Sequence, residues 1–547
     1  MKNCLKAATF GVTLLFVLAS AWVVDASPIP HLEKKGTATQ LIVDGKPFLV
    51  LGGELHNSSS SSLGYMKPIW PQLHAIHVNT VVTPVSWELI EPQEGKFDFT
   101  IVDGLIRGAR QNDLRLIFLW FGSWKNSMSS YTPPWVKTDG QRFPLAESSD
   151  GKGLEILTPF SDANCAADAT AFAALMKHLR EMDGHKHTVV MVQVENEIGM
   201  IPEARDHSAI ANQLYSNSVP SELMDYLQQH RDALTPEMAA VWGTNGYQTS
   251  GTWEDVFGPG IGTEEIFMAW YYARYTDRVA AAGKAEYPLP MYVNGALIRP
   301  GRKPGEYPSA GPLPHLMDIW RAGAPHLDIL SPDIYFPNFA DWCDKYHRLG
   351  NPLFIPETRP VPANLLYAIG QYDAVGVSPF GIDDEYARPP SGIFPTIGET
   401  YKILAELSPL ILQNQGSNNM AGVWLDQSNQ TQTVTLGNYT LKVAHDYTWA
   451  YSAGYGQTNE WPRMGGVIIA LAPDEYLVAG CGLIVTFTSN VPGKPSAGIV
   501  STDEGSFVDG RWVPGRRLNG DESHQGRHLS LPPDQCTIQC VKLYSYQ

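Results

Sequence analysis

Short apolar runs alternate with longer stretches of helical spacing along most of the chain. The run that begins at Val189 is rich in valine and methionine, which is typical of a strand buried on both faces. Seven other runs have a similar character, and helical apolar spacing recurs between them. We predict strands at 48–52, 79–84, 114–120, 189–199, 290–294, 327–331, 353–355 and 374–378. The predicted helices are 65–76, 101–111, 163–182, 221–234, 264–282, 313–322, 339–349, 363–370 and 399–413.

This alternation predicts an α/β fold, a (β/α)8 TIM barrel that spans residues 37–414. At the start of the barrel region, 40–43 and 47–50 flank Asp44-Gly45 and predict a hairpin. After residue 415 the pattern changes to short strands separated by Gly, Pro and Asn turns. These strands, at 434–443, 465–470, 475–479, 483–488 and 540–546, predict a smaller antiparallel β-sandwich-like domain over 415–547.

The N-terminus has the pattern of a secretory signal peptide over residues 1–26. Lys2 and Lys6 precede an apolar run from Ala7 to Val24, and small residues lie before a cut near Ser27. An uncleaved membrane anchor is the alternative, because the run is long enough to span much of a bilayer. We expect a secreted or periplasmic protein with no membrane contact after signal cleavage, because no later segment is long and apolar enough.

Composition excludes some partners and favours others weakly. The formal charge of −17 argues against nucleic acid, because no excess of Lys and Arg is available to release counterions. The 15 Trp and 24 Tyr residues suit the faces of sugars, although a large barrel core also uses many aromatic residues. No glycine-rich phosphate loop precedes a helix and no Cys/His spacing resembles a zinc site, so we expect no cofactor and no metal.

Signal cleavage would leave an odd number of cysteines, five. At least one thiol would then stay unpaired or pair between chains. In an oxidising compartment, we expect a disulfide within the late cluster of Cys481, Cys536 and Cys540.

Two predicted strands end in glutamates that could share one reaction. Glu197 ends the fourth strand and Glu357 ends the seventh, and strands four and seven lie on opposite sides of a barrel mouth. Hydrolysis of a glycosidic bond needs two carboxyl groups, one a proton donor and the other a nucleophile or base. Their environments must differ, so that one keeps its proton near neutral pH while the other is ionised.

Three motifs resemble glycoside hydrolase family 35. They are GGELH at 52–56, WELIEP at 87–92 and VQVENEIG at 192–199, within a resemblance that covers roughly residues 40–410. The resemblance implies a retaining exo-β-galactosidase with Glu197 as acid/base and Glu357 as nucleophile. Retention would place the two carboxyl groups about 5–5.5 Å apart. The expected partner is therefore a carbohydrate with terminal β-galactose.

Substrate contacts are predicted for six more residues, and a structural role is predicted for Glu195. Asn196 could hydrogen-bond the sugar 2-hydroxyl, with a loop cap as the alternative. Tyr335 resembles the tyrosine that steadies the nucleophile in this clan, and a core position is equally open for it. Glu54 would meet hydroxyls of the terminal galactose, with a structural ion pair as the alternative. Glu195 is expected to face away from the site and to stabilise the barrel. The remaining predicted substrate contacts, which could equally be packing residues, are Trp87, Trp124 and Asn294.

Departures from the family pattern leave other functions open. The third-strand signature is not evident in the segment 120–124, and the eighth strand ends in SPFG rather than in tryptophan. The chain also has one C-terminal β domain where larger relatives have several. A related barrel glycosidase acting on a β-glucoside, β-mannoside or arabinoside is one alternative. A catalytically silent carbohydrate-binding protein is another, and the oligomeric state is open.

Overall fold

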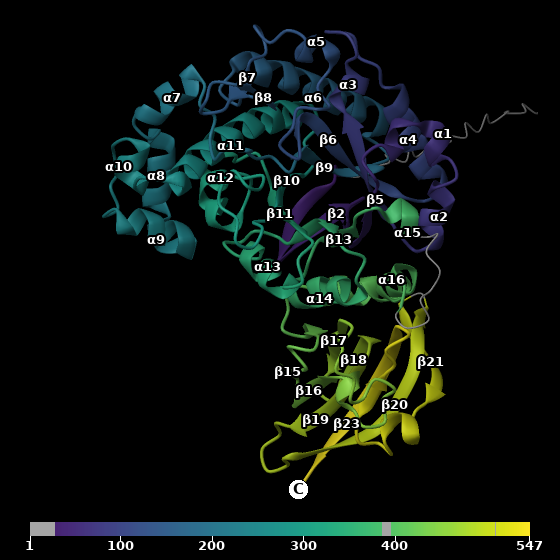
Figure 1. Ribbon diagram of the computed structural model, residues 1–547. Helices are drawn as coiled ribbons and strands as arrows, with labels where there is room; N and C mark the ends of the chain where they lie inside the picture. The colour runs from purple at the N-terminus through teal and green to yellow at the C-terminus, as the bar shows by residue number, and fades with distance from the viewer. Residues whose placement is uncertain (1–27, 386–394, 509) are drawn as a thin grey trace, which may run out of the picture.

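The computed structural model describes residues 28–385, 395–508 and 510–547 (Figure 1). The predicted signal peptide lies outside these residues. None of the helices in the described part of the chain has both the length and the apolar character needed to cross a membrane.

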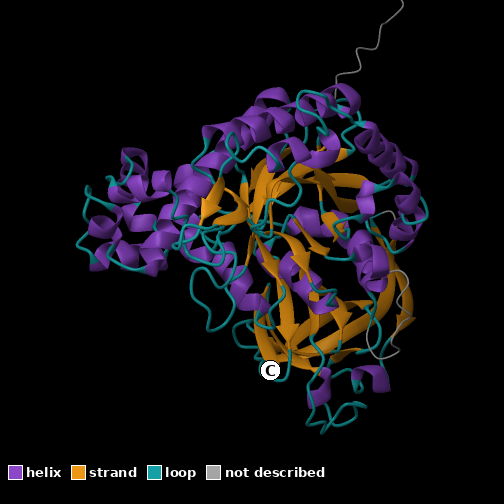
Figure 2. Cartoon of the chain, turned by 45° about the horizontal axis from the view of Figure 1, so that its top comes forward, coloured by secondary structure: helices purple, strands orange, loops and turns teal. Residues whose placement is uncertain are grey.

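Eight parallel strands of the described chain close into a barrel surrounded by helices, which confirms the predicted fold class (Figures 1 and 2). Each strand pairs with the next in chain order, and β13 closes the barrel on β4. The strands are β4 (Val50–Glu54), β5 (Thr80–Ser86), β6 (Arg115–Lys125), β9 (Val189–Asn196), β10 (Met291–Ala296), β11 (Ile329–Ile334), β12 (Phe354–Thr358) and β13 (Gly376–Pro379).

An apolar cluster fills the lower part of the barrel. Inward side chains such as Val82, Leu119 and Phe354 pack there, together with Leu41 and Val43 of the N-terminal sheet. That sheet contains β1 (His31–Lys35), β2 (Ala38–Val43) and β3 (Lys46–Phe48), and β2 and β3 form the predicted hairpin around Asp44-Gly45. The floor of the barrel is therefore apolar, and its polar side chains gather at the opposite end.

The helices follow the predicted positions with local differences. The predicted helix 65–76 is divided into α1 and α2, because Pro68 lacks an N–H group and clashes with the preceding turn. The helices are α1 (Leu63–Met66), α2 (Trp70–Ala75), α3 (Trp87–Ile90), α4 (Thr100–Gln111), α5 (Pro134–Lys137), α6 (Asp162–Asp183), α7 (Ala209–Ser216), α8 (Ser221–Gln229), α9 (Pro236–Thr244), α10 (Trp253–Phe257), α11 (Ile261–Glu286), α12 (Met317–Gly323), α13 (Phe339–Tyr346), α14 (Pro362–Tyr372), α15 (Ile382–Glu385) and α16 (Ile397–Asn414).

Insertions enlarge one side of the barrel. Between β9 and β10, helices α7 to α10 form a lobe that projects to the left in Figure 1. Between β6 and β9, β7 (Leu145–Glu147) and β8 (Gly153–Leu157) form an antiparallel hairpin. Sequence analysis did not predict this hairpin or most of the lobe.

Residues after α16 form two antiparallel sheets below the barrel in Figure 1. One has the order β14-β17-β18-β23-β20-β21 and the other β15-β16-β19-β22. The predicted strand 434–443 is instead a hairpin, because Gly437 turns the chain with a φ of +52°. The strands are β14 (Met420–Leu425), β15 (Thr431–Leu436), β16 (Tyr439–His445), β17 (Met464–Ala472), β18 (Glu475–Cys481), β19 (Leu483–Ser489), β20 (Ser496–Val508), β21 (Arg511–Arg517), β22 (Leu529–Leu531) and β23 (Thr537–Tyr546).

The five described cysteines are buried and free, so the expected disulfide is not formed in this structure. Cys481 and Cys536 instead share a side-chain hydrogen bond. The thiol of Cys536 also contacts the Thr400 hydroxyl of α16 at 3.6 Å. These thiols therefore lie where the β domain meets the barrel.

Side chains of α14 and α16 tie the β domain to the barrel. The indole of Trp424 donates a hydrogen bond to Asn364 Oδ1 at 3.0 Å, and Phe507 N–H donates to Glu406 Oε2 at 3.1 Å. Gly422 of β14 lies so close to α14 that an added Cβ would be 2.7 Å from Gln371 N. Because α14 follows the strand that carries Glu357, this packing supports the part of the barrel that forms the site.

Candidate active site

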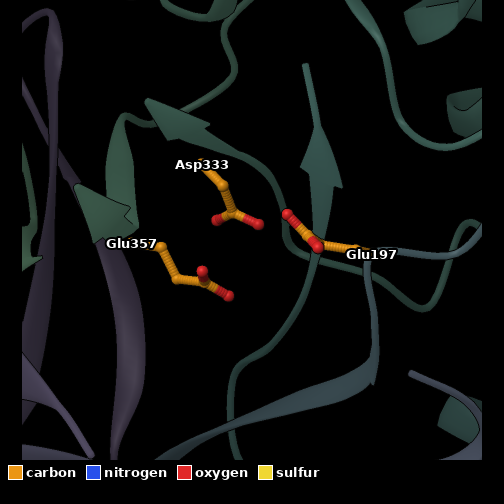
Figure 3. A group of neighbouring side chains, drawn as sticks. All are labelled: Glu197, Asp333 and Glu357. Atoms are coloured by element: carbon orange, nitrogen blue, oxygen red, sulfur yellow. The ribbon is translucent and has the colours of Figure 1, made fainter. Parts of the chain in front are cut away.

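Three carboxyl groups converge at the mouth of the barrel. Glu197 follows β9, Asp333 lies in β11 and Glu357 lies in β12, and each group is buried. One oxygen from each of the three lies within 4.8 Å of one from each of the others (Figure 3). The structure thus brings the two predicted catalytic glutamates together and adds an aspartate that sequence analysis did not assign.

The backbone at the end of β9 determines where its polar side chains point. Glu195 and Glu197 have φ values of +63° and +43°, which are unusual for residues other than glycine. Regular alternation would place these two residues on the same face of the strand, because they are two positions apart. The left-handed turn at Glu195 directs its side chain outward, and Asn196 and Glu197 then face the mouth. The predicted outward orientation of Glu195 is therefore observed, but it depends on this turn.

Glu357 accepts three hydrogen bonds from neutral donors. Tyr335 OH donates at 2.7 Å, Asn196 Nδ2 at 3.2 Å and Asn294 Nδ2 at 3.4 Å. Burial raises the pKa of Tyr335 above its ordinary value, so its hydroxyl keeps the proton that it donates. Hydrogen bonds to a carboxylate stabilise its negative charge. These contacts hold Glu357 in one orientation.

Glu197 has a different environment. Burial, followed by the charge of Glu357, raises the pKa of Glu197 to about 7, whereas the charge of Lys125 lowers it. The Asn126 side chain donates a hydrogen bond to Glu197 Oε2, and Glu197 N–H donates to Asn294 Oδ1 at 2.8 Å. Glu197 is consequently able to hold a proton near neutral pH.

Two other buried acids have unused hydrogen-bonding capacity. Neither carboxylate oxygen of Glu54 has a partner in the described chain, and burial and then the charge of Glu357 raise its pKa well above the ordinary value. Asp333 accepts a hydrogen bond from Asn294 Nδ2 at 2.6 Å, and burial likewise raises its pKa. Buried polar atoms without partners are costly, so the inward-facing Glu54 is well suited to hydroxyl groups of a ligand.

On the outer face of the barrel, Glu195 of β9 forms a second acidic pair with Asp168 of α6. Burial and then the charge of Asp168 raise the pKa of Glu195 well above its ordinary value, and the two carboxyl groups share a hydrogen bond. Glu195 Oε2 accepts from Trp124 N–H at 2.7 Å. Gly122 passes so close that an added Cβ would be 2.6 Å from Glu195 Oε1. This pair therefore holds the end of β6 against β9 and α6.

Trp87 and Trp124 do not have the predicted position at the mouth. Both side chains are fully buried, and neither lines the cavity beside Glu197 or the smaller cavity that adjoins it. The Trp87 indole donates to Glu91 Oε2 at 2.9 Å, and the Trp124 indole donates to Leu157 O at 3.1 Å. Their hydrogen bonds and ring contacts are those of packing residues, which corrects the predicted substrate contacts.

A cavity of about 510 Å³ opens beside Glu197. Sequence analysis did not single out four residues that line it, namely Asn126, Arg299, Phe336 and Asp333. Asp333 could have been found from its position at the end of a predicted strand, as the two glutamates were. The others lie in loops without a periodic pattern, so no local signal identifies them.

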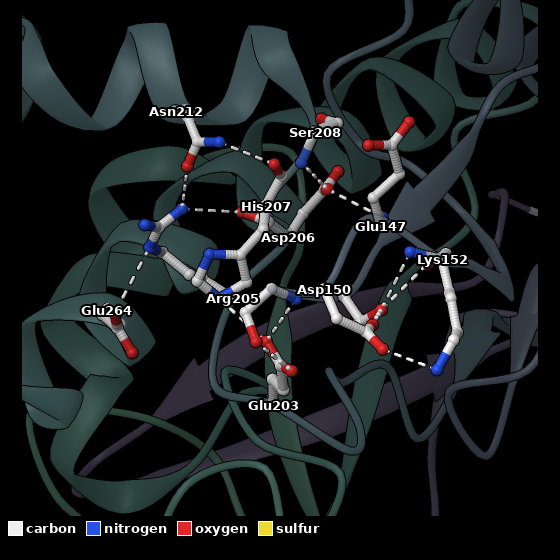
Figure 4. A network of polar contacts seen from close by, with 12 residues as sticks. Glu147, Asp150, Lys152, Glu203, Arg205, Asp206, His207, Ser208, Asn212 and Glu264 are labelled. Carbon is white, nitrogen blue, oxygen red and sulfur yellow. Dashed lines mark hydrogen bonds and ion pairs between the residues drawn. The ribbon is translucent and has the colours of Figure 1, made fainter.

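The segment after Glu197 forms part of the cavity wall and is held by a polar network (Figure 4). Asp206 accepts hydrogen bonds from Glu147 N–H at 2.9 Å and Ser208 N–H at 2.7 Å. Arg205 donates to Asn212 Oδ1 at 2.7 Å and pairs with Glu264 at 3.3 Å. The network connects this segment to the β7–β8 hairpin and to α11.

The three central carboxyl groups also have the oxygen ligands that Mg²⁺ or Ca²⁺ would use. A bound divalent cation would lower the pKa values of its carboxyl ligands. The raised pKa values of Glu197 and Asp333 show that burial and mutual repulsion favour protons at these two positions. The absence of a metal requirement thus remains a prediction.

Part of the chain is similar to proteins described as β-galactosidases. Residues 66–270 match the model of glycoside hydrolase family 42, described as Beta-galactosidase. The chain is 29% identical over 204 residues to the Beta-galactosidase of Xanthomonas manihotis, covering 36% of this chain and 32% of that protein. It is 26% identical over 170 residues to Beta-galactosidase 8 of Oryza sativa subsp. japonica, covering 30% and 23%. Each of these matches is to a family or protein described as a β-galactosidase, and each covers only part of this chain.

These matches are partial. The chain spans about a third or less of the length of the two curated relatives, and the family model is not that of family 35. Residues 397–530 match a domain of unknown function, DUF5597. Among solved structures, the β-galactosidase from Marinomonas ef1 has a TM-score of 0.43 at 12% identity, covering 67% of this chain and 60% of that one. The β-galactosidase from Bacillus circulans sp. alkalophilus has a TM-score of 0.44 at 15% identity, covering 66% and 57%.

We expect Glu195→Gln to stabilise the protein at neutral pH. The pKa of Glu195 is higher in the folded protein than in the unfolded chain. As the pH rises above the unfolded-state pKa, the carboxyl ionises in the unfolded chain but not in the folded protein, so the wild type loses stability until the folded-state pKa is passed. Glutamine keeps a donor for Asp168 and an acceptor for Trp124 N–H but has no proton to lose. Urea unfolding should show a gain of about 1 kcal/mol or more at about pH 7.5, shrinking toward pH 4.

The exposed Glu222→Gln variant is the control, and its stability should follow the wild type at both pH values. A Glu195→Gln variant less stable than the wild type at both pH values would contradict a protonated Glu195.

Proposed function

We propose that the chain is a retaining exo-β-galactosidase that removes terminal β-galactosyl residues from oligo- or polysaccharides. The main support is the pairing of Glu197, whose pKa of about 7 lets it keep a proton, with Glu357, which accepts three hydrogen bonds. Their nearest oxygens lie within 4.8 Å, which fits the short carboxyl separation of retaining enzymes better than the wider inverting one.

The proposed reaction has two displacements. Glu357 attacks the anomeric carbon while Glu197 gives its proton to the glycosidic oxygen, so that the leaving group departs as an alcohol. The galactosyl group is then bound covalently to Glu357. In the second step Glu197, now ionised, takes a proton from water as the water attacks the anomeric carbon and releases Glu357. Asn196 lies beside Glu357 and has a free Oδ1, which suits contact with the sugar 2-hydroxyl.

The burial of the site residues supports removal of sugars from the ends of carbohydrate chains. Glu54 and Asn196 are fully buried, and their free oxygens need hydroxyl groups delivered into the barrel mouth. A terminal sugar can enter such a site, whereas an internal residue would have to carry chain on both sides. The motifs in 52–56, 87–92 and 192–199 support assignment to family 35 within the broader β-galactosidase class. The pattern in residues 1–26 supports secretion.

Glu357→Ala should lower turnover of nitrophenyl β-galactoside on the order of a thousandfold or more, because the nucleophile is lost. Added azide should partly restore turnover by occupying the vacated position and forming a galactosyl azide of inverted configuration. The exposed Glu222→Ala variant should have wild-type kinetics. Wild-type activity in Glu357→Ala, with folding confirmed by circular dichroism, would exclude Glu357 from the mechanism.

The pH profile of kcat/KM should fall above about pH 7, because Glu197 must be protonated to assist departure of the leaving group. Above that pH, kcat/KM should fall by close to tenfold per pH unit. Removing the nearby positive charge in Lys125→Gln should move this limb to higher pH, since that charge lowers the pKa of Glu197. A limb that stays in place in Lys125→Gln would indicate that another group titrates.

Specificity should be tested on nitrophenyl β-galactoside, β-glucoside, β-mannoside and α-arabinoside, with galactose release from lactose and galactosylated xyloglucan oligosaccharides measured separately. We expect kcat/KM for the β-galactoside to exceed the others by about tenfold or more, because Glu54 and Asn196 hold buried, unpaired oxygens for matched hydroxyls. A higher kcat/KM for one of the other glycosides would favour the related barrel glycosidase of different specificity. Sugar binding without turnover of any compound would favour a catalytically silent binding protein.

A further inference from the structure

We propose that the leaving-group side of the substrate lies along a path from Glu197, over the ring of Phe336, to Arg463 of the β domain. The occupant would be a neutral carbohydrate chain of more than one sugar. This inference rests on the proposed function, because it uses Glu197 as the proton donor. It gives the C-terminal β domain, which matches a family of unknown function, a part in substrate binding.

The first part of the path is the cavity of about 510 Å³ beside Glu197. Its lining includes Glu197 but not Glu357. The acid/base residue protonates the leaving oxygen, so a cavity that opens on its side receives the leaving group rather than the galactosyl ring. The volume falls within the range of small-molecule sites, which leaves room for a sugar unit.

The lining of this cavity suits a sugar. Tyr307 and Phe336 contribute aromatic rings, which pack against the C–H faces of sugars. Arg299, Glu306 and Asn126 contribute polar groups for hydroxyls. Because the charged groups have both signs, the cavity has no clear preference for a charged sugar.

The second part of the path is an adjoining cavity of about 280 Å³. Tyr335 and Phe336 line both cavities, so these two residues form the boundary between them. The ring of Phe336 is held by Trp342, with ring centroids 6.1 Å apart. Arg359 lines the second cavity and is anchored by a hydrogen bond to Tyr335 O at 3.1 Å.

Arg463 brings the β domain to this second cavity. It lies just before β17, next to Pro462, whose carbonyl contacts His445 Nε2 at 2.9 Å. Asn364 of α14 lines the same cavity and accepts the Trp424 hydrogen bond that joins the two domains. Arg463 makes no ion pair closer than 4.0 Å in the described chain, so its guanidinium can donate to sugar hydroxyls.

A series of substrates whose leaving groups contain an increasing number of sugars tests this path. β-Galactosyl fluoride has no sugar leaving group, lactose has one sugar, and a galactosylated xyloglucan oligosaccharide has several. Wild-type kcat/KM should be higher for the oligosaccharide than for lactose. Phe336→Ala should lower kcat/KM for lactose and the oligosaccharide about tenfold relative to the fluoride. Arg463→Ala should lower only the oligosaccharide value relative to lactose, by about fivefold to tenfold.

The exposed Arg511→Ala variant, on β21 of the same domain, is the matched control and should leave all three ratios unchanged. Unchanged ratios in Phe336→Ala and Arg463→Ala, with all three substrates hydrolysed, would overturn the path and leave the proposed function intact. An equal decrease in kcat/KM for all three substrates would also overturn the path, because it would show that the substituted residue has a structural role. A wild-type protein that hydrolyses none of them would overturn the proposed function itself, and the path with it.

Discussion

The confinement of several carboxyl groups at one end of a closed barrel is the constraint on which the rest of the site depends. Glu197, Asp333 and Glu357 are buried within 4.8 Å of one another, and Glu54 adds a fourth acid close enough to interact with them. Four buried negative charges at such separations would be strongly unfavourable. Burial and mutual repulsion raise the pKa values of Glu54, Glu197 and Asp333, and three hydrogen-bond donors meet Glu357. Different protonation states within one acidic cluster are what general acid and nucleophilic catalysis require.

Asn294 is the residue that connects this cluster. Its Oδ1 accepts from Glu197 N–H, and its Nδ2 donates to Asp333 and, more weakly, to Glu357. A single amide from β10 therefore contacts the residue after β9 and side chains of β11 and β12. The predicted contact of Asn294 with substrate stays a prediction, and its hydrogen bonds in the structure are to the acidic side chains and to the backbone beside them. Its role in the cluster is to position those groups.

Much of this arrangement could be predicted from sequence, and the reason differs from residue to residue. Buried parallel strands have distinctive apolar runs, so the barrel and the positions of Glu197 and Glu357 at strand ends followed from pattern and spacing. Trp87 and Trp124 were misplaced because an aromatic residue at a strand end can turn toward the mouth or toward the helices. Only tertiary packing decides between these orientations, as the contacts of Trp124 with Tyr272 and Tyr275 show. The role of Asn126 depends on a left-handed backbone conformation that no local pattern indicates.

The packing of β14 and β17 against α14 has a consequence for biosynthesis. All eight barrel strands precede residue 380, whereas the sheet that covers α14 begins at residue 420 and needs residues up to 472 for β17. During synthesis from the N-terminus, the barrel can therefore close while one surface of α14 is still uncovered. Apolar surface exposed in this interval favours aggregation, so slow translation between α16 and β17 would prolong a vulnerable state. The β domain would then act late in folding, as a cover for a barrel that has already formed.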